Sequence, residues 1–266
     1  MNETATTTAV HARRAGFVHD LTSASIRALR QIPREPEAII PALVVPIFFF
    51  VVQTGALSNV AEFTGITDYP AFQLPVAIIF AVTGISRAGA LVTDIQGGYF
   101  DRLLVTPMNR AALLLELMIA DLALVIALSV PVVLLGFVVG VRFATGVLGI
   151  LAFLGLARLW GLAFTGFPYA IALKTGNPAA VNSSFILFFP FAFLTTTFLP
   201  QEALTGWLST IADFNPVTYL LSGLRALVDR GWDAQALGGA LLAIGGVGAV
   251  SFTMAFLALR GRISRD

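Results

Sequence analysis

Arg87, Asp121 and Arg158 are charged residues that lie deep inside apolar stretches of this sequence. Charges in such surroundings are costly, and they usually pair with one another or serve a bound solute. The chain has no Cys, and its two His residues, His11 and His19, precede the apolar stretches. Thiol chemistry and a His-based metal or catalytic site are therefore excluded there. The roles left for these charged residues are charge pairing and ligand binding. We therefore expect that the chain is not an enzyme.

Two of these charges lie at matching depths in neighbouring antiparallel segments. Arg87 precedes Gln96 by nine residues, or about 13 Å of helix, and Asp121 follows Ala111 by ten residues, or about 15 Å. We expect an Arg87–Asp121 pair that locks the two segments together; alternatively, each charge snorkels or meets backbone carbonyls. Arg158 has no acid at its depth, so it either bonds backbone and hydroxyl groups or contacts an anionic substrate or lipid head group.

The composition is that of a membrane protein. The 266 residues are 57% hydrophobic and 12% charged, with a mean hydropathy of +0.87. Soluble domains carry about twice that share of charge, and a chain of this length cannot hide so large an apolar excess in a core. The net charge of +1 gives no reason to expect a nucleic-acid partner.

Six apolar segments are long enough to cross a bilayer, which takes about 20 residues. These segments are 38–58, 71–95, 111–140, 146–173, 179–199 and 236–259. The second contains Arg87 and is the least uniformly apolar, and the third has an alternative end near Pro131. The predicted fold is all-α, with a cytoplasmic N-terminal segment at 1–37 and a six-span domain at 38–266.

The distribution of basic residues predicts the orientation. Twelve Lys and Arg residues lie at both chain ends and at one set of connections, counted with the end of the second span and its Arg87; three lie at the alternate connections. Cytoplasmic loops carry the excess of Lys and Arg, so both termini are expected in the cytoplasm and the protein in the cell membrane. No cleavable leader is apparent before the first span.

Two further segments are predicted to be short helices at the membrane surfaces. Residues 16–32 place apolar and charged side chains on opposite helix faces, which fits an amphipathic helix on the inner leaflet or one packed on another protein. Residues 200–235 are too apolar for a loop but are broken by Pro200 and by Asn215-Pro216. We expect two short helices there that re-enter the outer interface, with Tyr219 at the depth that Trp and Tyr favour.

The connection between the second and third spans holds a short amphipathic motif, Gly97-Gly98-Tyr99-Phe100-Asp101-Arg102-Leu103-Leu104-Val105-Thr106-Pro107-Met108-Asn109-Arg110. From physics alone it is either a helix that fits a groove on a soluble partner or an ordinary turn. It resembles the coupling-helix signature of type-2 ABC permeases, glu-x-gly-thr-leu-glu-arg-leu-leu-val-thr-pro. The match is strongest from Arg102 to Pro107. The acids that precede the family signature are replaced here by Gln96, Gly97 and Gly98.

A second segment, Asp213 to Tyr219 followed by Arg225, resembles the family's asn-pro-x-thr-tyr segment before the last span. Daunorubicin-resistance-type permeases are the most similar subgroup. The resemblance implies a dimer of permeases, with an identical or a homologous second subunit. Each permease would contact one ATPase subunit through the coupling helix, formed by Gly98, Tyr99, Phe100, Asp101, Arg102, Leu103, Leu104, Thr106 and Pro107.

The family resemblance also implies an export path for a hydrophobic or amphipathic substrate, drug-like or lipid, between spans one, two and five. The candidate lining residues are Phe48, Phe49, Gln53, Phe185, Phe188, Phe189 and Thr196; alternatively, the Phe residues face lipid. The only Lys-Thr pair, Lys174-Thr175, lacks the glycines of a phosphate-binding loop. ATP and Mg are therefore expected in the partner ATPase, with no cofactor in this chain.

Two competing functions remain. Within the class, the substrate could be lipid-linked or a polysaccharide. Outside it, an ATP-independent secondary transporter would need an acidic ion relay and an inverted repeat. Only Asp121 is a candidate for such a relay, and no repeat is apparent.

Overall fold

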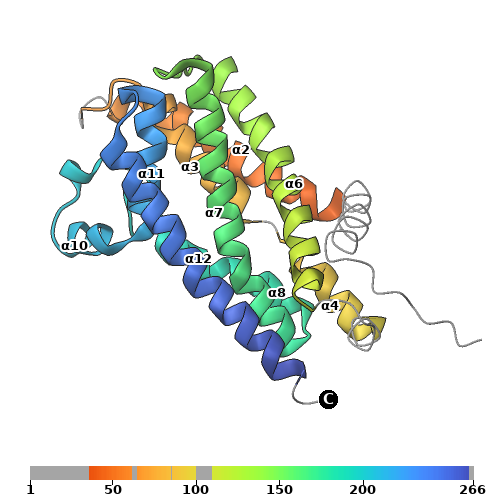
Figure 1. Ribbon diagram of the computed structural model, residues 1–266. Coiled ribbons are helices and arrows are strands. Elements are labelled where there is room, and N and C mark those ends of the chain that lie inside the picture. The colour runs from red at the N-terminus through yellow and green to blue at the C-terminus, as the bar shows by residue number, and fades with distance from the viewer. Residues whose placement is uncertain (1–35, 62–64, 85, 100–109, 264–266) are drawn as a thin grey trace, which may run out of the picture.

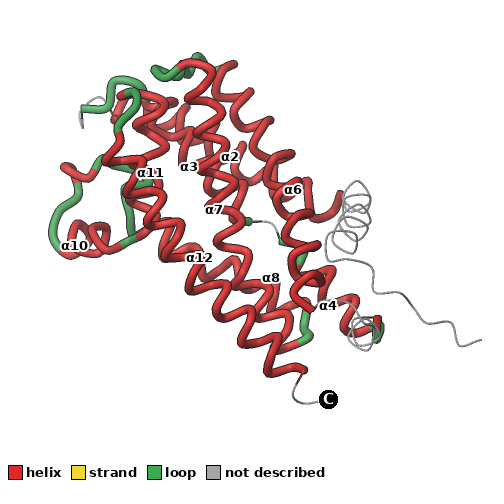
Figure 2. Tube along the Cα trace, in the orientation of Figure 1, coloured by secondary structure: helices red, strands yellow, loops and turns green. Residues whose placement is uncertain are grey.

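The structure is a computed structural model that describes residues 36–61, 65–84, 86–99 and 110–263. Every regular element within these ranges is a helix (Figures 1 and 2). The amphipathic helix expected at 16–32 and the coupling-helix residues Phe100 to Pro107 lie outside the described residues, and they stay predictions.

Five helical stretches in the described ranges are long and apolar enough to cross a membrane: Ile39–Asn59, Tyr69–Gln96, Met118–Val138, Gly146–Thr175 and Ala234–Arg262. They correspond to the predicted spans one, two, three, four and six. The helices that contain them are α2 (Pro36–Ala61), α3 (Tyr69–Thr83) with α4 (Ala88–Gln96), α6 (Arg110–Val138), α7 (Gly146–Thr175) and α12 (Ala234–Ile263). The third span runs as one α-helix past Pro131.

The second span is interrupted rather than continuous. Helix α3 ends at Thr83, and α4 begins at Ala88. Gly84 closes the last turn of α3, because its main-chain N–H bonds the Phe80 carbonyl at 3.2 Å. The prediction of a single helix over 71–95 missed this break, since hydropathy records which residues are apolar and not which carbonyls are bonded.

The fifth apolar segment is shorter than its predicted range of 179–199. It consists of α8 (Pro178–Ser183), the 3₁₀ turn η3 (Ser184–Leu187) and α9 (Phe188–Phe193), and it forms one apolar helical stretch from Pro178 to Phe193. Pro190 lies in the first turn of α9, where its missing main-chain N–H costs no hydrogen bond within that helix. The main-chain N–H of Leu194 bonds the Pro190 carbonyl at 2.9 Å, and the helix ends at Phe193.

Short helices follow before the last span. They are η4 (Gln201–Ala203), α10 (Trp207–Phe214), α11 (Pro216–Arg225) and the π-helical turn η5 (Ala226–Arg230). Asn215 caps α11, because its side chain accepts a bond from the main-chain N–H of Val217 at 2.9 Å. Helix α11 is buried against the bundle through Leu220, Leu221 and Leu224. Most of the large side chains of α10 are exposed, and that helix projects at the left of Figure 1.

Helix α7 forms the centre of the bundle, with α12 on one side and α6 on the other (Figure 1). Its Phe153, Trp160 and Tyr169 are among the largest fully buried side chains. Small residues allow α7 and α12 to approach closely: a Cβ atom on Gly166 would lie only 2.5 Å from the main-chain carbon of Ser251. The C-terminal ends of α4, α7 and α12 lie at one end of the bundle, which we call the C-terminal end (Figure 1).

Candidate functional site

A polar cluster lies at the break in the second span. Asp121 of α6 is fully buried, and one of its carboxylate oxygens accepts a hydrogen bond from the main-chain N–H of Arg87 at 2.6 Å. The other oxygen accepts a bond from the Tyr169 hydroxyl of α7, also at 2.6 Å. The Ser86 hydroxyl accepts from the N–H of Ala88 at 3.1 Å. The first N–H groups of a helix have no partner within it, so Asp121 and Ser86 close the start of α4.

This cluster joins three helices at one point. Asp121 comes from α6, Tyr169 from α7, and Arg87 is the residue just before α4. Carboxylates are also favoured at a helix N-terminus by the helix dipole. The sequence predicted a side-chain pair between Arg87 and Asp121; the structure brings the two residues together, with the 2.6 Å bond coming from the main chain of Arg87. Sequence reasoning missed Tyr169, although it lies at a matching depth near the end of the fourth span.

A cluster of phenylalanine rings joins the first, second, fourth and fifth apolar segments. Phe80 of α3 is its centre, with ring centroids of Phe49 at 6.3 Å, Phe188 at 5.4 Å and Phe189 at 6.4 Å. Phe164 of α7 lies 5.6 Å from Phe188 on the other side. We call these five residues the phenylalanine cluster. Three of them, Phe49, Phe188 and Phe189, were predicted for the substrate path; Phe80 and Phe164 were not, because only the fold places them between the other rings.

A pocket of about 390 Å³ opens beside this cluster, at the break in the second span. Its walls come from α2, from the end of α3, from α7 and from the start of the fifth segment. Phe80, Phe164 and Phe185 supply aromatic faces, and polar groups come from Thr83, Ser86, Asn182 and Ser184. On the other side of the Phe80 ring, the space between α2, α3 and the end of α9 is a void of only about 10 Å³. The pocket is thus closed in that direction by the phenylalanine cluster.

The remaining candidates for the substrate path have separate environments. Phe48 is 62% exposed on the outside of α2. Gln53 of α2 accepts a hydrogen bond from the side-chain amide of Gln73 on α3, which also donates to the Tyr69 hydroxyl at 2.8 Å. Thr196 faces neither the pocket nor the void, and it binds Arg225 instead.

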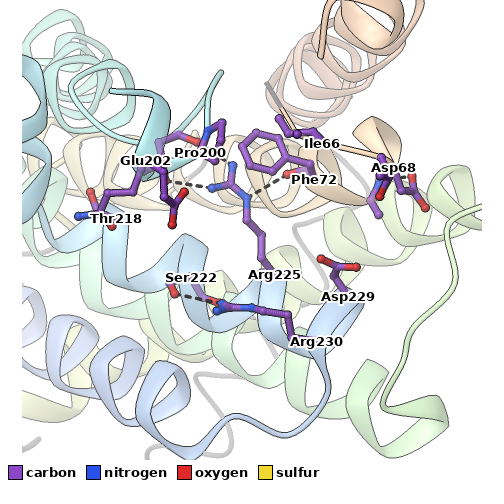
Figure 3. A pocket seen from close by; sticks show the side chains of 15 residues that line it. Ile66, Asp68, Phe72, Pro200, Glu202, Thr218, Ser222, Arg225, Asp229 and Arg230 are labelled. Atoms are coloured by element: carbon purple, nitrogen blue, oxygen red, sulfur yellow. Dashed lines mark hydrogen bonds between the residues drawn. The ribbon is translucent and has the colours of Figure 1, made fainter. Parts of the chain in front are cut away.

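Arg225 at the end of α11 holds three parts of the chain together. Its guanidinium donates to the Thr196 hydroxyl at 2.9 Å, to the Thr196 carbonyl at 2.7 Å and to the Phe72 carbonyl at 3.2 Å. The guanidinium carbon lies 3.5 Å from the centroid of the Phe72 ring (Figure 3), which is a cation–π contact. Removal from water lowers the pKa of Arg225, and the nearby charge of Arg230 acts in the same direction.

Asn215, at the start of α11, holds the other side of this junction. Its side-chain amide donates to the carbonyls of Phe191 at 2.7 Å and Leu194 at 2.8 Å, where α9 ends. The Tyr219 hydroxyl donates to the Asp213 carbonyl at 2.6 Å, and Pro216 takes the first position of α11, where no N–H is needed. The predicted residues Asn215, Pro216 and Tyr219 therefore lie together at the junction between the fifth segment and α11.

A second pocket, of about 490 Å³, lies over this junction. Both signs of charge line it, since Asp68, Glu202 and Asp229 lie around it together with Arg225 and Arg230 (Figure 3). Several of these groups already have partners, since Asp68 caps α3 at Ala71 and Arg230 bonds Ser222. This mixed lining does not select a ligand charge.

Two of the predicted coupling-helix residues, Gly98 and Tyr99, are described. Gly98, two residues after the end of α4, has a positive φ of 66°, a conformation that favours glycine, and Tyr99 is 40% exposed. Both lie at the C-terminal end of the bundle, beyond the helix that Asp121 caps. Arg158, the third intramembrane charge, is half-buried on α7, and its buried Nε has no hydrogen-bond partner in the described parts of the chain.

Comparisons with known proteins agree on one family. The model of the ABC-2 type transporter family matches residues 20–228. The chain is 26% identical to the daunorubicin resistance ABC transporter permease protein DrrB1 of Streptomyces coeruleorubidus, over 76% of this chain and 72% of that protein. It is 25% identical to the probable doxorubicin resistance ABC transporter permease protein DrrC of Mycobacterium tuberculosis, over 81% and 79%. It is 26% identical to the putative transport permease ycf38 of Cyanophora paradoxa, over 79% and 74%.

Proposed function

The chain belongs to the ABC-2 type transporter family, and from this membership we propose that it is the membrane-spanning subunit of an ATP-driven exporter. Two permease subunits, identical or homologous, form the membrane part, and each binds one ATPase subunit that holds ATP and Mg. Both termini lie on the cytoplasmic side of the cell membrane, with the N-terminal segment 1–37 against the inner leaflet and the permease domain at 38–266.

The phenylalanine cluster and its adjoining pocket carry the proposal about the substrate. Small-molecule pockets are mostly apolar, measure about 300–1,000 Å³ and contain a few polar groups. The 390 Å³ pocket fits that description, with three aromatic faces and four side chains that bear hydroxyl or amide groups. A hydrophobic or amphipathic compound of drug size is therefore the substrate class that we propose. The names of two relatives, which refer to daunorubicin and doxorubicin resistance, agree with this class.

The fold provides a route from the pocket to the ATPase. Ser86 lines the pocket and also bonds the first turn of α4. Helix α4 then runs for nine residues to Gly97, where the predicted coupling helix begins. A displacement of the coupling helix by the ATPase would therefore reach the pocket through one short helix. ATP hydrolysis would act by favouring one of two arrangements of α4.

A lipid-linked or polysaccharide substrate is the alternative within the class. The described pocket is small for such a molecule, and the phenylalanine cluster closes it on one side. A secondary transporter that uses Asp121 as its ion relay is less well supported. Both Asp121 oxygens are hydrogen-bonded and its side chain is fully buried, so the carboxylate has no contact with water in this conformation.

Transport of daunorubicin in proteoliposomes tests the proposal. The permease would be reconstituted with the ATPase subunit that co-purifies with it, and drug fluorescence would be followed after ATP addition. We expect ATP-dependent transport, and a several-fold rise in the half-saturating drug concentration for Phe185→Ala, which removes one wall of the pocket. Phe256→Ala is the matched control, because Phe256 is 42% exposed on α12 and lies outside the pocket. Equal transport with and without ATP would overturn the proposal.

The coupling contact is tested separately. Asp101→Ala combined with Arg102→Ala should reduce co-purification of the ATPase and uncouple its ATP hydrolysis from transport. Arg142→Ala combined with Glu202→Ala removes the same charges from exposed positions away from the C-terminal end, and it should leave co-purification unchanged. Unaltered transport and co-purification in the first variant would show that the ATPase binds elsewhere.

A further inference from the structure

A groove of about 620 Å³ lies between α7 and α12 at the C-terminal end of the bundle, apart from the proposed substrate pocket. The two helices run side by side to this end (Figure 1). Most of the groove is lined by apolar side chains. They come from α7 (Ala170, Ile171 and Leu173) and from α12 (Met254, Leu257 and Ala258). Met254 is 46% exposed and Leu257 59% exposed, so one wall of the groove faces outward from the bundle.

Among the described residues that line this groove, the basic ones lie at one end. Lys174, the only lysine of the chain, is in the last turn of α7, and Arg262 is in the last turn of α12. Both line the groove, and Lys174 is exposed. Cations at helix C-termini also offset the helix dipole, which explains their places along each helix. The dipole does not explain why an open apolar groove extends from them toward the middle of the membrane.

The dimensions fit one lipid at the membrane surface. From Met254 to Arg262 the groove follows α12 for eight residues, or about 12 Å, which is enough for a head group and the first part of an acyl chain. Both helices end here, so the basic side chains lie where the apolar spans meet the polar interface. Basic pockets between spanning helices on the cytoplasmic side bind anionic lipid head groups.

We propose that this groove binds an anionic phospholipid of the cytoplasmic leaflet, with its phosphate against Lys174 and Arg262 and its acyl chain along Met254 and Leu257. The lipid is a bound component of the membrane part, distinct from the exported substrate. Its acyl chain fills the gap between α7 and α12, so its binding stabilises the contact between the two central helices.

Binding is measured on the purified permease alone, without ATPase, ATP or transport, so the result does not depend on the proposed function. Native mass spectrometry in detergent would compare phosphatidylglycerol with phosphatidylcholine of the same acyl chains. We expect preferential binding of phosphatidylglycerol and about fivefold weaker binding for each basic residue removed. Lys174→Gln combined with Arg262→Gln should then weaken binding roughly thirtyfold, and Lys174→Arg should retain it.

The matched control is Arg142→Gln combined with Arg230→Gln, which removes two exposed cations away from the groove and should leave lipid binding unchanged.

Leu257→Trp tests the contact with the acyl chain, because a larger side chain would fill the groove while both charges remain. This variant should also weaken lipid binding. Equal binding of the two lipids, or equal loss in the control, would overturn the proposal. So would glycerol phosphate that binds as tightly as the lipid, since the site would then serve a free phosphate. Loss of ATPase co-purification in the Lys174/Arg262 variant with unchanged lipid binding would instead assign this surface to the ATPase.

Discussion

The carboxylate of Asp121 lies 2.6 Å from the main-chain nitrogen of Arg87, across an interruption in a membrane span. A broken helix at membrane depth exposes N–H groups that lipid cannot satisfy. Asp121 supplies the acceptor from the neighbouring helix, and Tyr169 donates to its second oxygen. The second span can therefore be divided into α3 and α4 without an unpaired N–H at Arg87.

Removal of the Asp121 carboxylate should destabilise the protein more than removal of the Tyr169 hydroxyl that donates to it. Asp121→Leu leaves both the Arg87 N–H and the Tyr169 hydroxyl without their acceptor, at about 1–3 kcal/mol each. Tyr169→Phe removes one bond and should cost about 0.6–2 kcal/mol. Both losses are measured as changes in the free energy of unfolding in mixed micelles. Ser129→Ala on the same helix is the control, because Ser129 bonds only the carbonyl of its own helix at Val125; a loss as large as that of Asp121→Leu would contradict the prediction.

Charge reversal tests the contribution of the Arg87 side chain. Arg87→Asp and Asp121→Arg should each abolish most transport, because each places two like charges together in a buried site. The double variant should recover part of the activity, since opposite charges face one another again. Full recovery is not expected, because an arginine at 121 cannot accept the main-chain bond of residue 87. No recovery at all would show that the two side chains do not pair.

Arg225→Lys should destabilise the junction of α11 with the fifth segment by about 2 kcal/mol. Lysine keeps the charge but lacks the planar fork that reaches Thr196 and the Phe72 carbonyl together. Arg230→Lys is the matched control, because this neighbour is exposed and its ion pair with Asp233 is long, at 3.7 Å. Its effect should stay within about 0.5 kcal/mol. Thermal stability of the purified permease distinguishes the two, and similar values would disprove the role assigned to Arg225.

Gly166→Ala should separate α7 from α12 and strongly lower thermal stability. The new Cβ atom would lie 2.5 Å from the main-chain carbon of Ser251, so the backbone itself would have to shift. Gly155→Ala on the same helix meets nothing within 4 Å, and it should be neutral or stabilising by up to about 1 kcal/mol. A stable Gly166→Ala protein would mean that the two helices tolerate a wider separation.

Arg158→Gln should leave stability nearly unchanged, because the buried Nε of Arg158 has no partner among the described residues that the change would break. If this side chain contacts an anionic substrate, the same variant should lose transport of anionic amphiphiles and keep transport of cationic ones. Parallel transport assays with an anionic and a cationic compound that share the same acyl chain or ring system measure this difference. Retained transport of the anionic compound would show that Arg158 does not contact the substrate.

The sequence was sufficient to locate the membrane spans, but it did not predict the interruptions within them. Hydropathy located five of the spans within a few residues, because each is a long apolar run. The breaks at Gly84 and Leu194 depend on hydrogen bonds to Asp121 and Asn215, which are far away in sequence, and no local pattern contains them. Proline gives no local signal for such a break, since Pro131 lies inside a continuous helix.

The contacts of the candidate site were likewise predictable only in part. Equal depth on antiparallel neighbours predicted that Arg87 and Asp121 would lie close together, because that inference needs only the helix rise and the order of the spans. The partners of Arg225 could not be inferred in this way. Phe72 precedes it by 153 residues, and Thr196 was assigned to the substrate path instead. Only the packing of α11 against α3 brings these residues together.

The bonds from Asn215 to the carbonyls of Phe191 and Leu194 also constrain the order in which the chain assembles. Those carbonyls are synthesised more than twenty residues before the amide that binds them. During synthesis the fifth segment therefore enters the membrane with its end unfinished, and it must wait for α11 to emerge from the ribosome. A chain truncated before Asn215 would retain five apolar segments and still lack the group that completes the last of them.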